Sequence, residues 1–277
     1  MTLVVLALKV LLAPSLVAAA TRTARALGHR AGGLVGGLPV VAAPIVFIYA
    51  VEHGASFAAR AAQGTVLGIV SLVGFSVAYA EVGRRTSWPL ALLAGWSAFL
   101  VLTLLFATRS LPLALSCVLA AVAVAGASRV LARRVSGPAS SGGSDLLRWR
   151  LLATAAMVVA LTTAAGSLSP WVSGLLAPFP IITAVLAAFT QAQAGADAST
   201  ELLAGLVPGL ASFILFFVVV GVGLPALGIP GAFALATAAA LASHVVLAGR
   251  ARRAQRAGAP LSGVPQRTQM SENGVGA

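Results

Sequence analysis

The chain contains apolar runs of about 20 residues that follow one another with only short polar interruptions. A helix of that length crosses the ~30 Å hydrocarbon core of a bilayer. Only 9% of the 277 residues are charged, and they cluster between the runs. We therefore predict nine spans with approximate ends, at 2–20, 32–50, 62–81, 88–107, 112–132, 150–168, 171–190, 202–222 and 229–249.

The predicted fold class is all-α, a polytopic membrane protein. The hydrophobic fraction is 59%, above the ~45–50% expected of a soluble domain. A soluble fold would leave a large apolar surface uncovered. The first partner of the chain is therefore the lipid bilayer.

Several functional classes are disfavoured by the sequence. The net charge of +12 does not indicate a nucleic-acid partner, because the arginines lie at the ends of apolar runs, as the positive-inside rule requires. His29, His53 and His244 show no metal-site spacing, and no hydrolase, protease or nucleotide-binding motif is present. The single cysteine, Cys117, excludes a disulfide framework. We expect no enzyme activity, no cofactor and no metal.

Orientation follows from the basic residues. An outer N-terminus and a cytoplasmic C-terminus place 15 of the 18 lysines and arginines in the cytoplasm. The three that remain are Lys9, Arg60 and Arg109. The opposite orientation would put those 15 outside, against the positive-inside rule. We predict a multi-pass protein of the cytoplasmic (inner) membrane in the first orientation.

A Gly/Ser-rich linker at 136–147 divides the chain into two parts. The first half, residues 1–135, holds five predicted spans, and the second half, residues 148–249, holds four. Residues 250–277 are basic and then polar, which predicts a disordered cytoplasmic tail.

The two halves contain related segments. Arg60–Phe75 (RAAQGTVLGIVSLVGF) and Glu201–Phe216 (ELLAGLVPGLASFILF) align without gaps, so that Arg60 corresponds to Glu201 and every later pair keeps the same offset. We call this constant separation the repeat offset. Five positions are identical: Gly64/Gly205, Val66/Val207, Gly68/Gly209, Ser71/Ser212 and Phe75/Phe216. The Gly-x-x-x-Gly spacing in both copies predicts close helix packing.

The spans before these segments each carry Gly-Leu and a pair of prolines. The first has Gly37-Leu38-Pro39 and Pro44, and the second has Gly174-Leu175, Pro178 and Pro180. Aligning Pro44 with Pro180 makes the first copy about five residues shorter before Gly54, the counterpart of Gly195. The odd number of spans in the first half predicts that the repeat is inverted across the membrane. Inverted repeats with interrupted helices are typical of secondary transporters.

These motifs resemble the GlpM family of small bacterial inner-membrane proteins. The matching residues are Lys9, Gly37-Leu38-Pro39, Pro44 and Glu52-His53-Gly54, then Gly174-Leu175, Pro178, Pro180 and Gly195. The second copy departs by lacking a counterpart of the lysine and an acidic residue before Gly195. The resemblance implies a tandem duplication of a four-span unit. Because one group of that family is linked to exopolysaccharide production, it also implies a role in the cell envelope.

Lys9 lies about halfway along the first predicted span. A cation at that depth is costly unless it faces a cavity or a partner, although a lysine stem can snorkel to the surface. The prolines Pro39, Pro44, Pro178 and Pro180 free backbone carbonyls that must be satisfied or face a cavity, unless they are ordinary kinks. We therefore expect spans 2 and 7 to form the walls of a site.

Glu52 and His53 end the second span and could exchange a proton, or could be a solvated helix end. Glu201 begins the eighth span, where an acidic residue also suits the helix dipole. It is the counterpart of Arg60, so the two could form gating ion pairs on opposite faces.

Two functions remain open on the sequence. The first is a secondary transporter or flippase-like carrier of a small or lipid-linked solute, working by alternating access between the halves. The alternative is a non-transporting membrane factor that supports envelope or exopolysaccharide synthesis. The substrate, the coupling ion and the oligomeric state are not encoded in these patterns.

Overall fold

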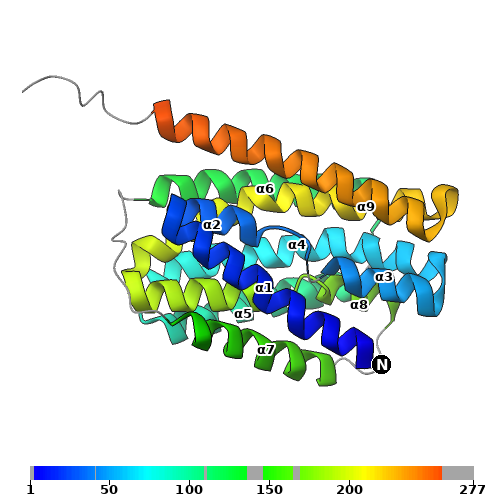
Figure 1. Cartoon of the computed structure of the whole chain (residues 1–277), viewed down its shortest axis with the longest axis horizontal. Helices are drawn as coiled ribbons and strands as arrows, with labels where there is room; N and C mark the ends of the chain where they lie inside the picture. Colours follow the sequence, from blue (N-terminus) through cyan, green and yellow to red (C-terminus); the bar gives the residue numbers. More distant parts are fainter. Residues whose placement is uncertain (1–2, 41, 109–110, 136–145, 165–168, 258–277) are drawn as a thin grey trace, which may run out of the picture.

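The computed structural model describes residues 3–40, 42–108, 111–135, 146–164 and 169–257 (Figure 1). The side chains of residues 3–10, 12, 158–164, 251, 252 and 254–257 lie outside this description, as does most of the predicted linker and tail. Within the described ranges every regular element is a helix. The all-α fold class is confirmed.

The helices follow the apolar runs, and short polar or Pro/Gly segments separate them. In chain order they are α1 (Leu3–Leu27), α2 (His29–Gly36), α3 (Ala42–His53), α4 (Ala55–Gly83), α5 (Trp88–Ala107), α6 (Leu113–Arg134), α7 (Leu147–Ala164), α8 (Pro170–Leu176) and α9 (Ile181–Ala257).

The 77-residue helix α9 consists of three segments. Its backbone leaves the helical conformation at Gly195 and at Gly228, where φ is 86° and 65°. Such φ values strain any residue with a Cβ atom, so glycine permits the chain to reverse there. We call the segments α9a (181–194), α9b (196–227) and α9c (229–257).

Four described segments are long and apolar enough to cross a membrane. They are Ala55–Gly83, Trp88–Ala107, Leu113–Arg134 and the region Pro170–Arg250, which contains α8 and most of α9. The prediction that the chain carries several long apolar helices is thus confirmed by these four segments. The count of nine spans stays a prediction, because spans 2 and 7 are each divided into two short helices.

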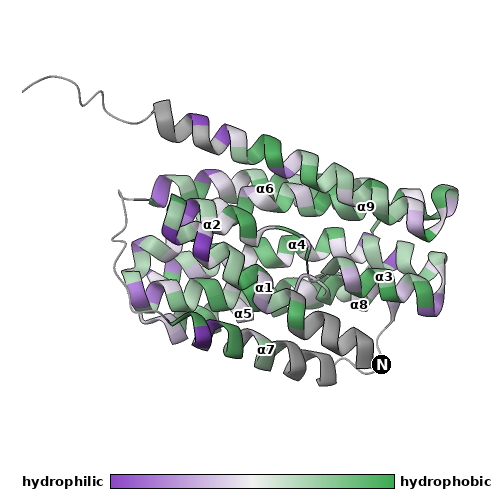
Figure 2. Cartoon of the chain, in the orientation of Figure 1, coloured by the Kyte–Doolittle hydropathy of each residue, from purple (hydrophilic) through white to green (hydrophobic). Residues whose placement is uncertain are grey.

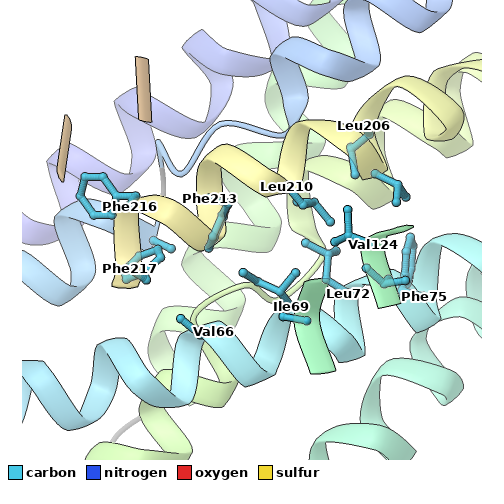
Figure 3. Packing of buried hydrophobic residues seen from close by; sticks show 14 of the residues in the cluster. Val66, Ile69, Leu72, Phe75, Val124, Leu206, Leu210, Phe213, Phe216 and Phe217 are labelled. Atoms are coloured by element: carbon cyan, nitrogen blue, oxygen red, sulfur yellow. The ribbon is translucent and has the colours of Figure 1, made fainter. Parts of the chain in front are cut away.

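The core lies where α4 crosses α9b (Figure 3). Ile69 and Leu72 of α4 pack with Leu210 and Phe213 of α9b, and Val124 of α6 closes the same cluster. These side chains are all buried. The centre between the two halves is therefore apolar.

Outward faces are apolar as well. Helix α5 exposes Leu93 and Leu104, and α6 exposes Val118 and Val122, as lipid-facing helices do. Hydrophilic residues gather mainly at the left-hand end of the bundle (Figure 2). At that end Arg134 of α6 pairs with Glu81 of α4 at 2.9 Å. This one-sided distribution is the pattern on which the predicted orientation depends.

Candidate functional site

The first broken helix consists of α2, which ends at Gly36, and α3, which begins at Ala42. Gly37 and Leu38 donate backbone hydrogen bonds to Leu34 and Val35, which closes α2 with tight turns. Pro39 has no backbone N–H to donate, so one helical hydrogen bond is missing at the interruption. Its carbonyl instead accepts from Ala43 at 2.9 Å and starts α3.

The second broken helix consists of α8 and α9a, and it is interrupted in the same way. Phe179 donates to Leu176 at 2.9 Å, and Ala184 donates to the carbonyl of Pro180 at 2.8 Å. Each of these two hydrogen bonds has a counterpart in the first half at the repeat offset, from Leu38 to Val35 and from Ala43 to Pro39. The two interruptions thus share one backbone pattern.

Each broken helix packs against the long helix of the opposite half. Helix α2 contacts α9b, and α8 contacts α4. The α2–α9b contact joins Gly33 to Leu202, Gly205 to Arg30, and Gly209 to Leu34. A Cβ atom at Gly209 would lie 2.9 Å from the Leu34 carbonyl oxygen, and the other two contacts are closer. Only glycine permits backbones to approach this closely.

The α8–α4 contact repeats that arrangement. It joins Gly174 to Ala61, Gly64 to Trp171, and Gly68 to Leu175. A Cβ atom at Gly64 or at Gly68 would lie 2.5 Å from the facing carbonyl oxygen. Every residue in these three contacts is related by the repeat offset to its counterpart in the α2–α9b contact. The packing role predicted for the Gly-x-x-x-Gly segments matches these contacts.

The predicted prolines divide between the interruptions and a helix start. Pro39, Pro178 and Pro180 lie in the interruptions and are buried. Pro44 lies in the first turn of α3, where proline is tolerated. Pro178 approaches the position of a Cβ atom at Gly68 within 2.8 Å, so this proline faces the opposite long helix.

The ionisable candidates are spread over the molecule. Glu52 and His53 are exposed at the end of α3, and the His53 ring stacks on Phe57 with centroids 4.6 Å apart. Glu201 is half-buried in α9b, close to Gly28 at the start of α2. Lys9 lies in α1, and its side chain is outside the described residues. The structure does not bring Glu201 together with Glu52 and His53.

A polar cluster that the sequence analysis missed surrounds Arg150 in the first turn of α7. The side chain is 5% exposed, although its sequence pattern indicates only an orienting charge. It donates to Thr21 of α1 at 3.1 Å and to Gln193 of α9a at 2.7 Å. Its guanidinium lies 5.8 Å from the centre of the Phe189 ring. The sequence could have pointed to Arg150 through its position, because the repeat offset relates Arg150 to Lys9.

A second polar contact lies between α9b and α9c. The Ser212 hydroxyl donates to the carbonyl of Gly209 at 2.6 Å and lies 3.4 Å from Nδ1 of His244. The counterparts of these two residues at the repeat offset, Ser71 and Thr103, are both buried. Their hydroxyls have no hydrogen-bond partner in the described structure. This contact therefore belongs to the second half alone.

The arrangement combines two interrupted helices, reciprocal glycine contacts and an apolar centre. Among the described residues no group of three His, Cys, Asp or Glu side chains could hold a metal ion. The interruptions offer backbone polar groups, and Arg150 offers a buried cation.

Comparisons with protein-family models, curated proteins and solved structures find no match. The resemblance to the GlpM family stays a prediction from short motifs.

Proposed function

We propose that the chain is a carrier of a small or lipid-linked solute that works by alternating access between two inverted repeats. The observation that carries the proposal is the pair of reciprocal contacts, α2 on α9b and α8 on α4, in which residues recur at one offset. This pattern is expected when two copies of one unit are related by a two-fold axis and each packs its broken helix against the long helix of the other.

The direction of the helices supports inversion of the repeats. Helices α1 and α7, which would open the two repeats, lie side by side (Figure 1). They run in opposite directions, because Arg150 near the start of α7 contacts Thr21 near the end of α1. Two units related in this way can exchange conformations, which opens one central site to either side of the membrane.

The recurring contacts also favour a different alignment of the prolines. They match Pro39, rather than Pro44, with Pro180, because both residues start the second part of a broken helix through their carbonyls. The first copy then needs no deletion before Gly54. The same register matches Lys9 with Arg150, so each copy carries a cation in its first helix.

The apolar packing around Ile69 and Leu210 bears on the solute. A carrier for a strongly polar solute requires polar groups along its path, so this centre favours a weakly polar or lipid-linked one. The same packing also favours the alternative, a non-transporting factor in envelope synthesis, because a scaffold needs no path at all. The two candidates differ in whether the buried interface ever opens.

Cysteine accessibility tests that difference without knowledge of the solute. Ala58 at the start of α4 and Ser199 near the start of α9b are counterparts, and both are buried. In a Cys117→Ser background, we expect Ala58→Cys to react with an impermeant maleimide only from outside. We expect Ser199→Cys to react only from the cytoplasmic side, because each is uncovered when its own side opens.

The matched control is Ala120→Cys in α6, which is equally buried but lies outside the repeated contacts. It should stay unlabelled on the same timescale. If Ala58→Cys and Ser199→Cys react no faster than Ala120→Cys in native membranes, the carrier proposal fails and the scaffold alternative gains.

Topology is tested by reporter fusions, since inversion depends on it. A reporter after residue 55 or after residue 110 should report the outer side, and one after residue 260 should report the cytoplasm. The reason is the asymmetry of the arginines. A cytoplasmic signal at 55 or 110, or an outer signal at 260, would contradict the inverted arrangement.

A further inference from the structure

Arg150 is a charged residue in an unfavourable place. It lies in the first turn of α7, where the helix dipole disfavours a cation, and it is 5% exposed. Removing a guanidinium from water is costly, so a buried arginine in a membrane protein indicates a site by default. Its partners Thr21 and Gln193 come from two other helices, α1 and α9a. Arg150 therefore lies where both halves meet.

The counterpart of Arg150 in the first repeat is also a cation, Lys9. Lysine and arginine make up 18 of the 277 residues, so a match between two such residues is rare by composition. Orientation does not explain both, because the predicted topology places Arg150 at the cytoplasmic end of its span but Lys9 about halfway along its own span. A function shared by the two repeats explains the match.

The two positions are spaced along one pair of helices. Thr21, which accepts from Arg150, follows Lys9 on α1 by about three helical turns. At 1.5 Å per residue the two levels are ~18 Å apart along the helix. A ligand that interacts with each cation in turn would therefore move across much of the bilayer along α1 and α7.

We propose that Arg150, with Thr21 and Gln193, binds a phosphate-bearing anion, and that the solute of the carrier is an anion of this class. The identity of the carried solute rests on the proposed function, but the binding site itself does not. A guanidinium forms paired, charge-assisted hydrogen bonds to phosphate oxygens. The Thr21 hydroxyl and the Gln193 amide can each donate to the same anion once the arginine turns to it.

Binding is measured on the full chain in detergent, as the shift in melting temperature on adding one probe at a time. The probes are phosphatidylglycerol, phosphatidylcholine and inorganic phosphate. Phosphatidylglycerol should raise the melting temperature by roughly 5 °C at saturating concentration, as ligand linkage predicts. Phosphatidylcholine should give no comparable shift. A shift with inorganic phosphate would identify a free phosphate as sufficient, and its absence would assign the anion to a lipid headgroup.

The variant Arg150→Gln should lose this shift. Arg148→Gln is the matched control, because it removes the same charge from the same turn of α7 at an exposed position. It should keep the full shift. Arg150→Lys keeps the charge and installs the residue type of the first repeat, so it should fold even if Arg150→Gln does not, and should show a reduced shift.

Equal shifts in Arg150→Gln and Arg148→Gln would overturn the anion site. So would equal shifts by phosphatidylglycerol and phosphatidylcholine, or a full shift in Arg150→Lys together with loss of folding in Arg150→Gln, which is the pattern of a purely structural residue. Failure of the carrier proposal is distinguishable from these outcomes. In that case Ala58→Cys and Ser199→Cys stay unlabelled while the shift in melting temperature still depends on Arg150.

Discussion

Replacing Gly205 by alanine should destabilise the protein strongly. A Cβ atom at Gly205 would overlap the carbonyl oxygen of Arg30 and lie 2.9 Å from its Cα atom. Backbone atoms cannot rotate away, so α2 must separate from α9b. Forcing extra atoms into a packed contact costs about 1–3 kcal/mol. We expect a lower melting temperature and less monodisperse protein after detergent extraction.

Gly126→Ala is the matched control for this prediction. Gly126 lies in α6, and a Cβ atom there would meet nothing within 4 Å. That substitution should be neutral or slightly stabilising, because alanine favours the helix. If Gly205→Ala melts at the same temperature as Gly126→Ala, the close contact between α2 and α9b does not exist.

The equivalent glycine in the first half allows a second test of the same contact. Gly64 is the counterpart of Gly205, and its added Cβ atom would lie 2.5 Å from the carbonyl oxygen of Trp171. Gly64→Ala should therefore be destabilised in the same way as Gly205→Ala. A severe effect at one position and none at the other would contradict equivalent interfaces.

Replacing Lys9 by methionine should remove most of the activity while preserving the protein. Methionine keeps an apolar stem of similar length and removes the charge. Insertion should hold or improve, since lysine at mid-membrane costs ~2.5–3.5 kcal/mol on insertion scales. The readout is the rate at which fluorescently labelled phosphatidylglycerol in proteoliposomes becomes accessible to dithionite, compared at matched protein content. Lys9→Arg should restore only part of the rate, because the planar guanidinium group of arginine does not replace the compact ammonium group of lysine.

Arg85→Met is the control for Lys9→Met. It also removes one cation, but Arg85 is exposed in the short segment after α4. Its rate should stay close to that of the wild type. Full activity in Lys9→Met would mean that Lys9 is a tolerated snorkelling residue. The helix interruptions at Pro39 and Pro180 would then be the next candidates for the solute-binding site.

Most of the secondary structure followed from the sequence. The runs near 62–81, 88–107 and 112–132 correspond to α4, α5 and α6, because apolar length alone decides where a helix can cross a bilayer. The prolines also indicated where spans 2 and 7 are irregular. They did not reveal that each span divides into two short helices, since a proline can kink a helix as well as end it.

The sequence locates some of the residues that we assign to the candidate site, and their role in a site stays a prediction. Pro39, Pro178 and Pro180 were placed in site walls by their chemistry, and they lie in the two interruptions. Arg150 was missed, because an arginine beside a loop has the same sequence pattern whether it only orients the chain or is buried. Burial depends on neighbours from α1 and α9a, which are distant in sequence.

By itself the sequence determined that the chain is a bundle of apolar helices with its basic residues at their ends, because the bilayer sets hydrophobic length and charge placement locally. Only the tertiary structure decided which helix each glycine faces. Gly64 and Gly205 have the same local sequence pattern, yet each contacts the broken helix of the opposite half. That pairing depends on how helices far apart in the sequence pack together, and close backbone approach is a property of the packed pair.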